Sequence, residues 1–138
     1  MNVEPLTKPM VSESTHGYSK RILDHFLNPR NVGALKEANA VGEVGAAAFG
    51  DVMKLSLRIR AGRIEEARFQ AFGCGTAIAT ASAMTELIKG RTVDEALNFS
   101  NQQVIDALGG LPAEKIHCSM LAEEAVKAAV KDYLKRKT

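Results

Sequence analysis

Two neighbouring stretches near the middle of the chain alternate between apolar and polar residues. Residues 51–60 alternate over their whole length, and residues 64–72 do so with smaller side chains. Such alternation predicts strands with one buried and one solvent-facing side. Ala61 and Gly62 between them are typical of a tight turn, so the pattern predicts a β-hairpin and an antiparallel sheet. The apolar positions of the first stretch are Met53, Leu55, Leu57 and Ile59.

The apolar spacing becomes helical after the hairpin. Residues 77–89 are rich in small side chains, which predicts a helix packed closely on the sheet and ended by Gly90. A hydroxyl residue followed three positions later by Glu or Gln predicts capping boxes at 92–95 and 100–103, each opening a short helix. A last helix is expected from about residue 119 to residue 135. Strands followed by helices predict an α+β fold.

The first third of the chain is less regular. Residues 1–17 mix Pro, Ser, Thr and Gly without a period, which predicts a flexible N-terminal tail. The folded domain is expected to span residues 18–138. Ile22, Leu23 and Phe26 are spaced for one face of a helix that ends at Asn28-Pro29, followed by a loop leading into a short strand.

Composition limits the classes of protein to consider. The 138 residues suit one domain, and a net charge of +2 is too small to indicate nucleic acid or a membrane as a partner. No apolar run approaches the roughly 20 residues that a membrane span needs, and no signal peptide is recognisable. Two cysteines are too few for a secreted disulfide scaffold, so we expect a cytoplasmic protein with reduced thiols.

Metal-binding side chains collect at three turns of the chain. Asp51 begins the first predicted strand, Cys74 lies between two glycines ahead of a helix, and His117 and Cys118 precede the last helix. A helix N-terminus favours a thiolate, which we expect at both cysteines. One oxygen, one nitrogen and two sulfur ligands suit tetrahedral Zn²⁺ or iron. No C-x-x-C pair is present, so these residues alone indicate a metal site or a reactive-thiol site.

Five sequence segments together are similar to one known family. The chain resembles the IscU/NifU-type iron–sulfur cluster assembly scaffold, a SufE-like α/β domain family, from Tyr18 to about Lys135. The GGLP segment at 109–112 is closest to the N-terminal domain of NifU. The matching segments are Tyr18, HFLNPRNVG (25–33), GDVMKL (50–55), FGCGTAIA (72–79) and KIHCS (115–119).

The resemblance implies both a fold and a function. The fold is a three-stranded antiparallel sheet with helices packed on it, and the protein is not an enzyme. In this family a cysteine desulfurase delivers sulfur as a persulfide, iron arrives separately, and a [2Fe–2S] cluster is built and handed on. The cofactor is therefore a labile [2Fe–2S] cluster or iron, with zinc as an alternative occupant. A frataxin-like protein, a ferredoxin and an Hsp70-type chaperone system are further implied partners.

The resemblance also implies residue roles. Cys118 corresponds to the persulfide-receiving cysteine, Cys74 to a cluster ligand and His117 to an alternate ligand. Asp51 corresponds to the aspartate that keeps the cluster labile and can itself ligate zinc. Tyr18 resembles a tyrosine linked to regulated persulfide reduction.

The chain departs from the family pattern at two places. Phe49 stands where the family has its first cluster cysteine, so a cluster needs His117 and Asp51 as well as the two thiolates, or an outside thiol. Phe49 has two interpretations: it caps an apolar strand start, or it shields or blocks the metal site. Residues 111–115 read LPAEK where the chaperone-recognition motif reads LPPVK.

Two other functions follow from these observations. The missing cysteine favours a degenerate paralogue, a zinc-binding regulatory or adaptor protein that docks on the desulfurase without building clusters. A thiol enzyme would use Cys118 with His117 as its base, which requires the imidazole within hydrogen-bond reach of the sulfur. A nucleic-acid module is disfavoured, because the two tyrosines form no stacking motif.

Overall fold

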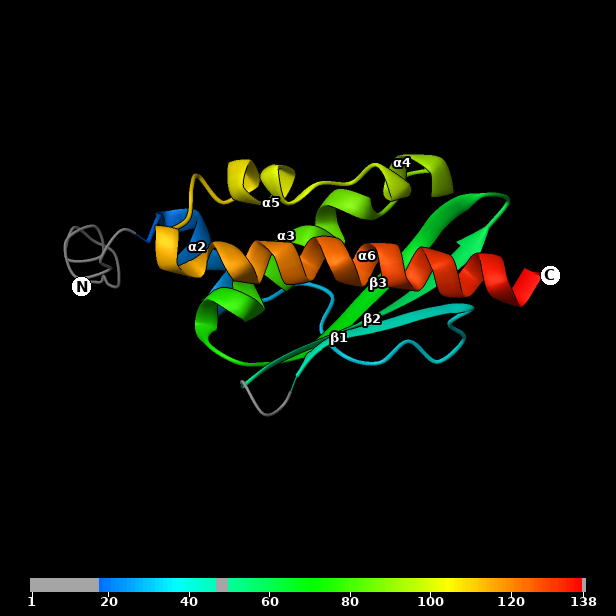
Figure 1. The fold of residues 1–138 in the computed structure, drawn as a ribbon, viewed down its shortest axis with the longest axis horizontal. Coiled ribbons are helices and arrows are strands. Elements are labelled where there is room, and N and C mark those ends of the chain that lie inside the picture. Colours follow the sequence, from blue (N-terminus) through cyan, green and yellow to red (C-terminus); the bar gives the residue numbers. More distant parts are fainter. Residues whose placement is uncertain (1–17, 47–49, 138) are drawn as a thin grey trace.

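A three-stranded antiparallel sheet in the order β1-β2-β3 carries helices packed against it, which confirms the predicted fold class (Figure 1). The computed structural model describes residues 18–46 and 50–137. The predicted tail at 1–17 and Phe49 therefore lie outside the described residues. The elements are α2 (Lys20–Leu27), β1 (Ala40–Ala46), β2 (Asp51–Arg60), β3 (Arg63–Phe72), α3 (Gly75–Ile88), α4 (Val93–Leu97), α5 (Asn101–Ala107), the 3₁₀ turn η2 (Ala113–Lys115) and α6 (Ile116–Lys137).

The β2–β3 hairpin turns where the sequence predicts it. Ala61 and Gly62 have φ angles of 53° and 77°, and Arg60 pairs with Arg63 across the turn. Two successive residues with positive φ match the right-handed twist of the flanking strands. The hairpin fixes the register, so that the start of β2 and the end of β3 lie at the same end of the sheet.

Helix α6 crosses β1 at a position that only glycine can fill. A Cβ atom at Gly42 would lie 2.5 Å from the backbone nitrogen of Ala129 and 2.8 Å from the carbonyl oxygen of Ala125. Both alanines are fully buried. The small residues let the helix backbone lie directly on the sheet.

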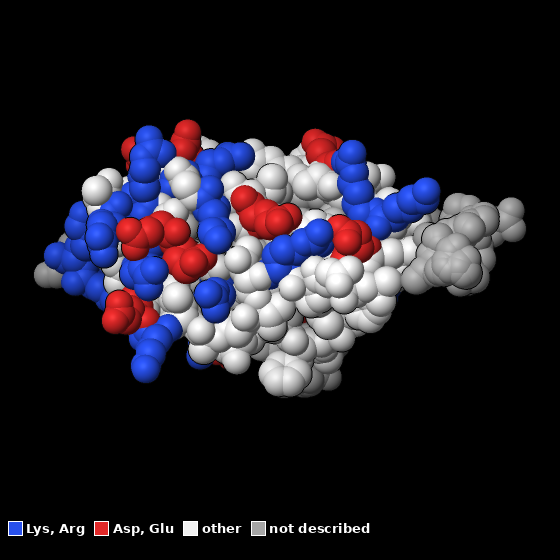
Figure 2. All heavy atoms as spheres, turned by 180° about the vertical axis from the view of Figure 1, so that it is seen from behind, with Lys and Arg blue, Asp and Glu red and all other residues white. Residues whose placement is uncertain are grey.

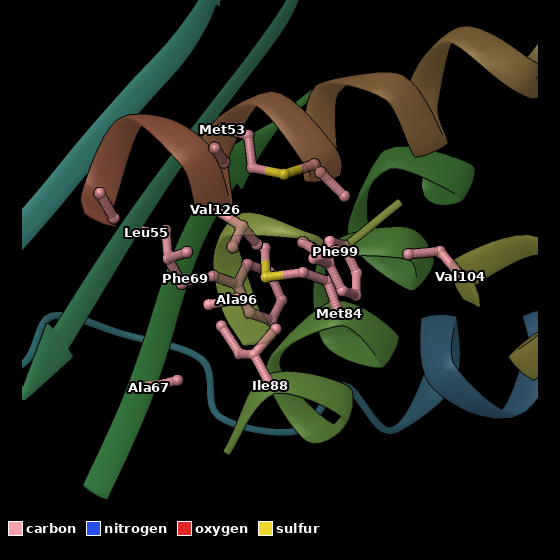
Figure 3. Packing of buried hydrophobic residues seen from close by; sticks show 14 of the residues in the cluster. Met53, Leu55, Ala67, Phe69, Met84, Ile88, Ala96, Phe99, Val104 and Val126 are labelled. Atoms are coloured by element: carbon pink, nitrogen blue, oxygen red, sulfur yellow. The ribbon is translucent and has the colours of Figure 1, made fainter. Parts of the chain in front are cut away.

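The core fills the space between the sheet and helices α3, α4 and α6. Figure 3 shows Leu55 and Phe69 of the sheet directed toward Met84, Phe99 and Val126 on the helical side. All five side chains are buried. Figure 2 shows that Lys and Arg gather at the end of the molecule that holds the C-terminus of α6. In the described ranges, no helix is both long and apolar enough to cross a membrane.

Helix α2 is fastened to α3 by a buried hydroxyl. The Ser82 Oγ atom accepts the backbone N–H of Arg30 at 2.9 Å and lies 2.7 Å from Nδ1 of His25. A His25 ring with its proton on Nε2 would accept the hydroxyl proton at Nδ1, and a ring with its proton on Nδ1 would donate to the hydroxyl oxygen. Beyond α2, residues 31–33 pair with the free edge of β3 through bonds to Phe69.

Two sequence predictions about helix starts are wrong. Ser100 is the N-cap of α5, but its side chain makes no capping bond: the Gln103 N–H that it would accept bonds the Ser100 carbonyl oxygen at 3.1 Å. The Glu123 carboxylate of α6 accepts the Asn101 N–H at 2.7 Å. Helix α6 begins at Ile116, earlier than predicted, because the turn η2 continues directly into it. The capping box at Thr92, by contrast, is confirmed.

Candidate functional site

The strand and helix ends bring the four predicted metal-binding residues to one end of the molecule. Asp51 is the first residue of β2, and Cys74 is the N-cap of α3 just after β3. Val52 of β2 pairs with Phe72 of β3. Asp51 and Cys74 therefore lie at adjacent ends of these two neighbouring strands. His117 and Cys118 lie in the first turn of α6 and not in a loop ahead of it. The starts of α3 and α6 lie with α2, away from the C-terminus (Figure 1).

The four side chains form a continuous row. The sulfur atoms of Cys74 and Cys118 are 3.9 Å apart, and the Cys118 sulfur lies 3.6 Å from Nε2 of His117. The same Nε2 atom lies 3.2 Å from Oδ2 of Asp51. Asp51 and His117 are 66 positions apart in the sequence, and Cys74 and Cys118 are 44 positions apart. The fold thus brings together side chains from β2, the start of α3 and α6.

The spacing of neighbouring ligand atoms agrees with a tetrahedral metal. Metal–sulfur bonds of about 2.3 Å place two sulfur ligands about 3.8 Å apart, and a sulfur and a nitrogen ligand about 3.6 Å apart. The Cys74–Cys118 and Cys118–His117 distances are close to these values. Within residues 18–46 and 50–137, however, no three such side chains surround a common point as a metal ion needs. Binding therefore requires rotation of at least one side chain.

The two thiols differ in ionisation. Burial acts to raise the pKa of Cys74. Hydrogen bonds from the backbone N–H groups of Ala77 and Thr76 at the start of α3 act to lower it and outweigh burial, so the pKa of Cys74 is lowered overall. Burial, followed by the charge of Cys74, raises the pKa of Cys118 to about 12. The lowered pKa of Cys74 agrees in direction with the thiolate expected at a helix start, whereas the raised pKa of Cys118, which is 0% exposed, does not.

A lysine that sequence reasoning did not assign lies beside the thiols. The negative charge of Cys74 raises the pKa of Lys115, and Tyr18 contributes in the same direction. The Lys115 ammonium in turn favours the Cys74 thiolate. Lys115 is the first residue of the KIHCS segment (115–119), so the available sequence signal was its position two residues before His117.

Steric constraints explain why a glycine stands on each side of Cys74. Gly73 has a φ angle of 148°, and a Cβ atom there would lie 2.3 Å from Oδ1 of Asp51. A Cβ atom at Gly75 would lie 2.9 Å from the ring of Phe26 on α2. The spacing placed Phe26 with Ile22 on one helix face, yet Ile22 is buried, whereas Phe26 is 43% exposed and its ring covers the first turn of α3. Linear spacing does not reveal that contact.

His25 lies outside this row of side chains. Its ring is bound to Ser82 at 2.7 Å and lies 3.6 Å from Glu86. Burial, followed by the charge of Arg30, lowers the pKa of His25. These contacts give His25 a role in joining α2 to α3.

Comparison with known proteins places the chain among cluster-assembly proteins. It is 48% identical over 119 residues to the iron–sulfur cluster assembly scaffold protein IscU 1 of Archaeoglobus fulgidus, which covers 86% of this chain and 78% of that protein. It is 50% identical over 124 residues to the scaffold protein IscU of Azotobacter vinelandii, covering 87% and 96%. The crystal structure of a NifU-like N-terminal protein from Brucella abortus has the same fold, with a TM-score of 0.66, 21% identity and coverage of 86% and 94%.

The family comparison covers nearly the whole folded part. Residues 17–138 match the NifU-like N terminal domain family. The matched range includes Asp51, Cys74, His117 and Cys118 and every helix and strand described above. The chain is therefore a member of the NifU-like N-terminal domain family.

Proposed function

We propose that this chain is a scaffold on which an iron–sulfur cluster assembles before transfer to other proteins. The observation that carries the proposal is the pair of sulfur atoms 3.9 Å apart, with His117 and Asp51 in contact next to them. The names of the Archaeoglobus fulgidus and Azotobacter vinelandii relatives support the same role. The cluster is cargo, and the chain acts as a binding surface and not as an enzyme.

Four protein ligands complete a [2Fe–2S] cluster, because each tetrahedral iron also binds two bridging sulfides. This chain supplies two sulfurs, one imidazole and one carboxylate, from Cys74, Cys118, His117 and Asp51. Mixed sulfur and nitrogen ligation of such clusters is chemically established. The carboxylate is a harder ligand than thiolate, so it holds iron less firmly and favours release. Zinc, which accepts the same ligands, is an alternative occupant.

Sulfur enters at Cys118 in this proposal. Its thiolate attacks the outer sulfur of the persulfide on a cysteine desulfurase, and the thiolate of the desulfurase leaves. Because Cys118 is fully buried and its pKa is raised to about 12, the first turn of α6 has to open when the desulfurase docks. Tyr18, close enough to influence Lys115, would act in the reduction of that persulfide.

The remaining partners are proposed with the same scaffold role. A frataxin-like protein and a ferredoxin would take part in the delivery of iron and the supply of electrons. The segment of residues 111–115, which includes the turn η2, is the expected contact of an Hsp70-type chaperone system, although its LPAEK sequence departs from the family motif.

The other two functions have less support. A zinc-binding adaptor that builds no cluster is not suggested by the names of the two relatives. A thiol enzyme meets one condition, since Cys118 and His117 are 3.6 Å apart. A thiol enzyme would have to use Cys118 without the opening that a docked desulfurase is proposed to cause, and a buried thiol whose pKa is raised to about 12 is a poor nucleophile.

Anaerobic reconstitution tests the proposal. The full chain is incubated with ferrous iron, sulfide and a thiol, desalted, and examined for visible charge-transfer absorption and acid-labile sulfide. The scaffold role predicts both signals, and Cys74→Ser should abolish them. Stoichiometric zinc in purified protein with no cluster under any condition would favour the adaptor. Mass spectrometry after mixing with a desulfurase and free cysteine should find the persulfide on Cys118 in the Cys74→Ser variant.

A further inference from the structure

The two cysteines of this chain are close enough to react with each other. Their sulfur atoms are 3.9 Å apart, and no third cysteine competes for either of them. A disulfide bond is about 2.05 Å long, so the atoms must approach by about 1.9 Å. Both thiols are free in this structure.

The surrounding backbone holds the pair in place. Cys74 caps α3 and Cys118 lies in the first turn of α6, and the two helices pack side by side. The buried Thr80 hydroxyl on α3 lies 3.4 Å from the carbonyl oxygen of Cys118 and shares its one proton with the nearer carbonyl oxygen of Ala77 at 3.0 Å. The relative position of the two helix starts is therefore set, and rotation of the cysteine side chains is the movement that brings the sulfurs together.

Solvent access differs between the two thiols. Cys74 is half-buried, whereas Cys118 is completely buried. A small oxidant from solvent meets Cys74 first. Any modified sulfur at Cys74 then has Cys118 as its nearest thiol neighbour.

We propose that Cys74 and Cys118 form an intramolecular disulfide when the metal-free protein meets a small oxidised disulfide such as oxidised glutathione. In the first step the Cys74 thiolate attacks one glutathione sulfur, a mixed disulfide forms and one glutathione thiolate leaves. In the second step the Cys118 proton passes to solvent, the Cys118 thiolate attacks the Cys74 sulfur, and the second glutathione leaves as a thiolate; the two released thiolates take up two protons from solvent. The two protein thiols are oxidised by two electrons, and one oxidised glutathione becomes two reduced molecules.

The disulfide would act as a reversible lock on the site. It occupies both sulfur atoms, so neither is available to iron or zinc, and it ties the start of α3 to the start of α6. Reducing thiols restore the open site. The bond needs no metal, so the inference goes beyond the proposed scaffold role and does not depend on it.

Intact-mass spectrometry tests the lock. The reduced, metal-free full chain is exposed to oxidised glutathione, quenched with iodoacetamide and weighed. The expected product has lost two hydrogens, carries no glutathione and has no alkylated thiol, and a digest contains Cys74 linked to Cys118. The Cys118→Ser variant should instead keep one glutathione on Cys74, because the second step is removed. The Cys74→Ser variant should remain unmodified, because Cys118 is buried.

Three results would overturn the inference. After exposure to oxidised glutathione, the wild-type protein could retain a bound glutathione, or both of its thiols could still be alkylated by iodoacetamide. The third result is a disulfide between two chains, seen on a non-reducing gel. The linked peptide in the wild-type digest decides the question even if a serine variant folds poorly.

Discussion

The carboxylate of Asp51 occupies the space that a side chain at Gly73 would need. The ideal Cβ position of Gly73 lies 2.3 Å from Oδ1 of Asp51 and 3.2 Å from the Gly50 carbonyl oxygen. The glycine therefore lets the end of β3 pass directly beside the start of β2. This close approach brings Asp51 to the same end as the cysteines.

Gly73→Ala should disturb both the backbone and the carboxylate. The φ angle of 148° is strained for any residue with a Cβ atom, and the methyl group displaces Asp51. We expect a loss of about 1–3 kcal/mol in the free energy of unfolding, measured by urea denaturation, and weaker zinc binding measured by titration. Gly62→Ala is the control, because its φ is also positive but nothing lies within 4 Å. Equal zinc binding by both variants would contradict the role given to Gly73.

The two thiols of the metal-free protein should react with iodoacetamide at different rates. Cys74 has a lowered pKa and is half-buried, whereas the pKa of buried Cys118 is raised to about 12. The thiolate is the reactive form, so Cys74 should be alkylated first, with a rate midpoint at lower pH than that of free cysteine. Peptide mapping after short exposures checks the order. Faster labelling of Cys118 under native conditions would refute it.

Phe26→Ala should increase the reactivity of Cys74. The Phe26 ring covers Gly75 in the first turn of α3, next to Cys74. Removing the ring opens that side to solvent, so we expect alkylation to accelerate severalfold. Leu27→Ala is the matched control, because the neighbouring side chain is 57% exposed on the same helix. Equal rates in the two variants would show that the ring does not limit access.

His25 should make stability depend on pH. Burial and the charge of Arg30 lower its pKa, while Glu86 and Asp24 act in the opposite direction with smaller effect. The unfolded chain therefore binds a proton at higher pH than the folded chain does. This contribution is fully present above the unfolded pKa of about 6.5 and is lost as pH falls through the folded pKa. Urea denaturation at several pH values gives the free energy of unfolding as a function of pH. This dependence should be shallower in His25→Gln than in the wild type, and an equal dependence in both would exclude His25 as its cause.

Phe49→Cys should increase cluster yield, because it adds a third thiolate next to Gly50-Asp51 in the sequence. We expect more acid-labile sulfide and slower loss of the cluster to a chelator than in the wild type. Phe49→Ser is the control, since it removes the ring without adding a strong iron ligand. Equal gains in both variants would indicate that the ring blocks entry, and no gain in either would show that Phe49 is not limiting.

The sequence by itself determined the hairpin, most of the helices and which residues are candidate metal ligands. Alternation over 51–60 and the turn at Ala61 and Gly62 are local properties, so they could be read directly. The Ser100 capping box could not: Ser100 is the N-cap of α5 but its side chain makes no bond, and a carboxylate from α6 accepts the neighbouring Asn101 N–H. Local patterns do not record such competing tertiary partners.

Tertiary structure alone decided how the site residues differ. Two cysteines at helix starts look equivalent in the sequence, yet one is half-buried with a lowered pKa and the other is fully buried with a raised pKa. Burial depends on which elements pack over a residue, and that is set by contacts between distant parts of the chain. The same packing lays Phe26 on Gly75 and Asp51 on Gly73. The sequence specifies the chemical groups, and the fold sets their distances, access and charge.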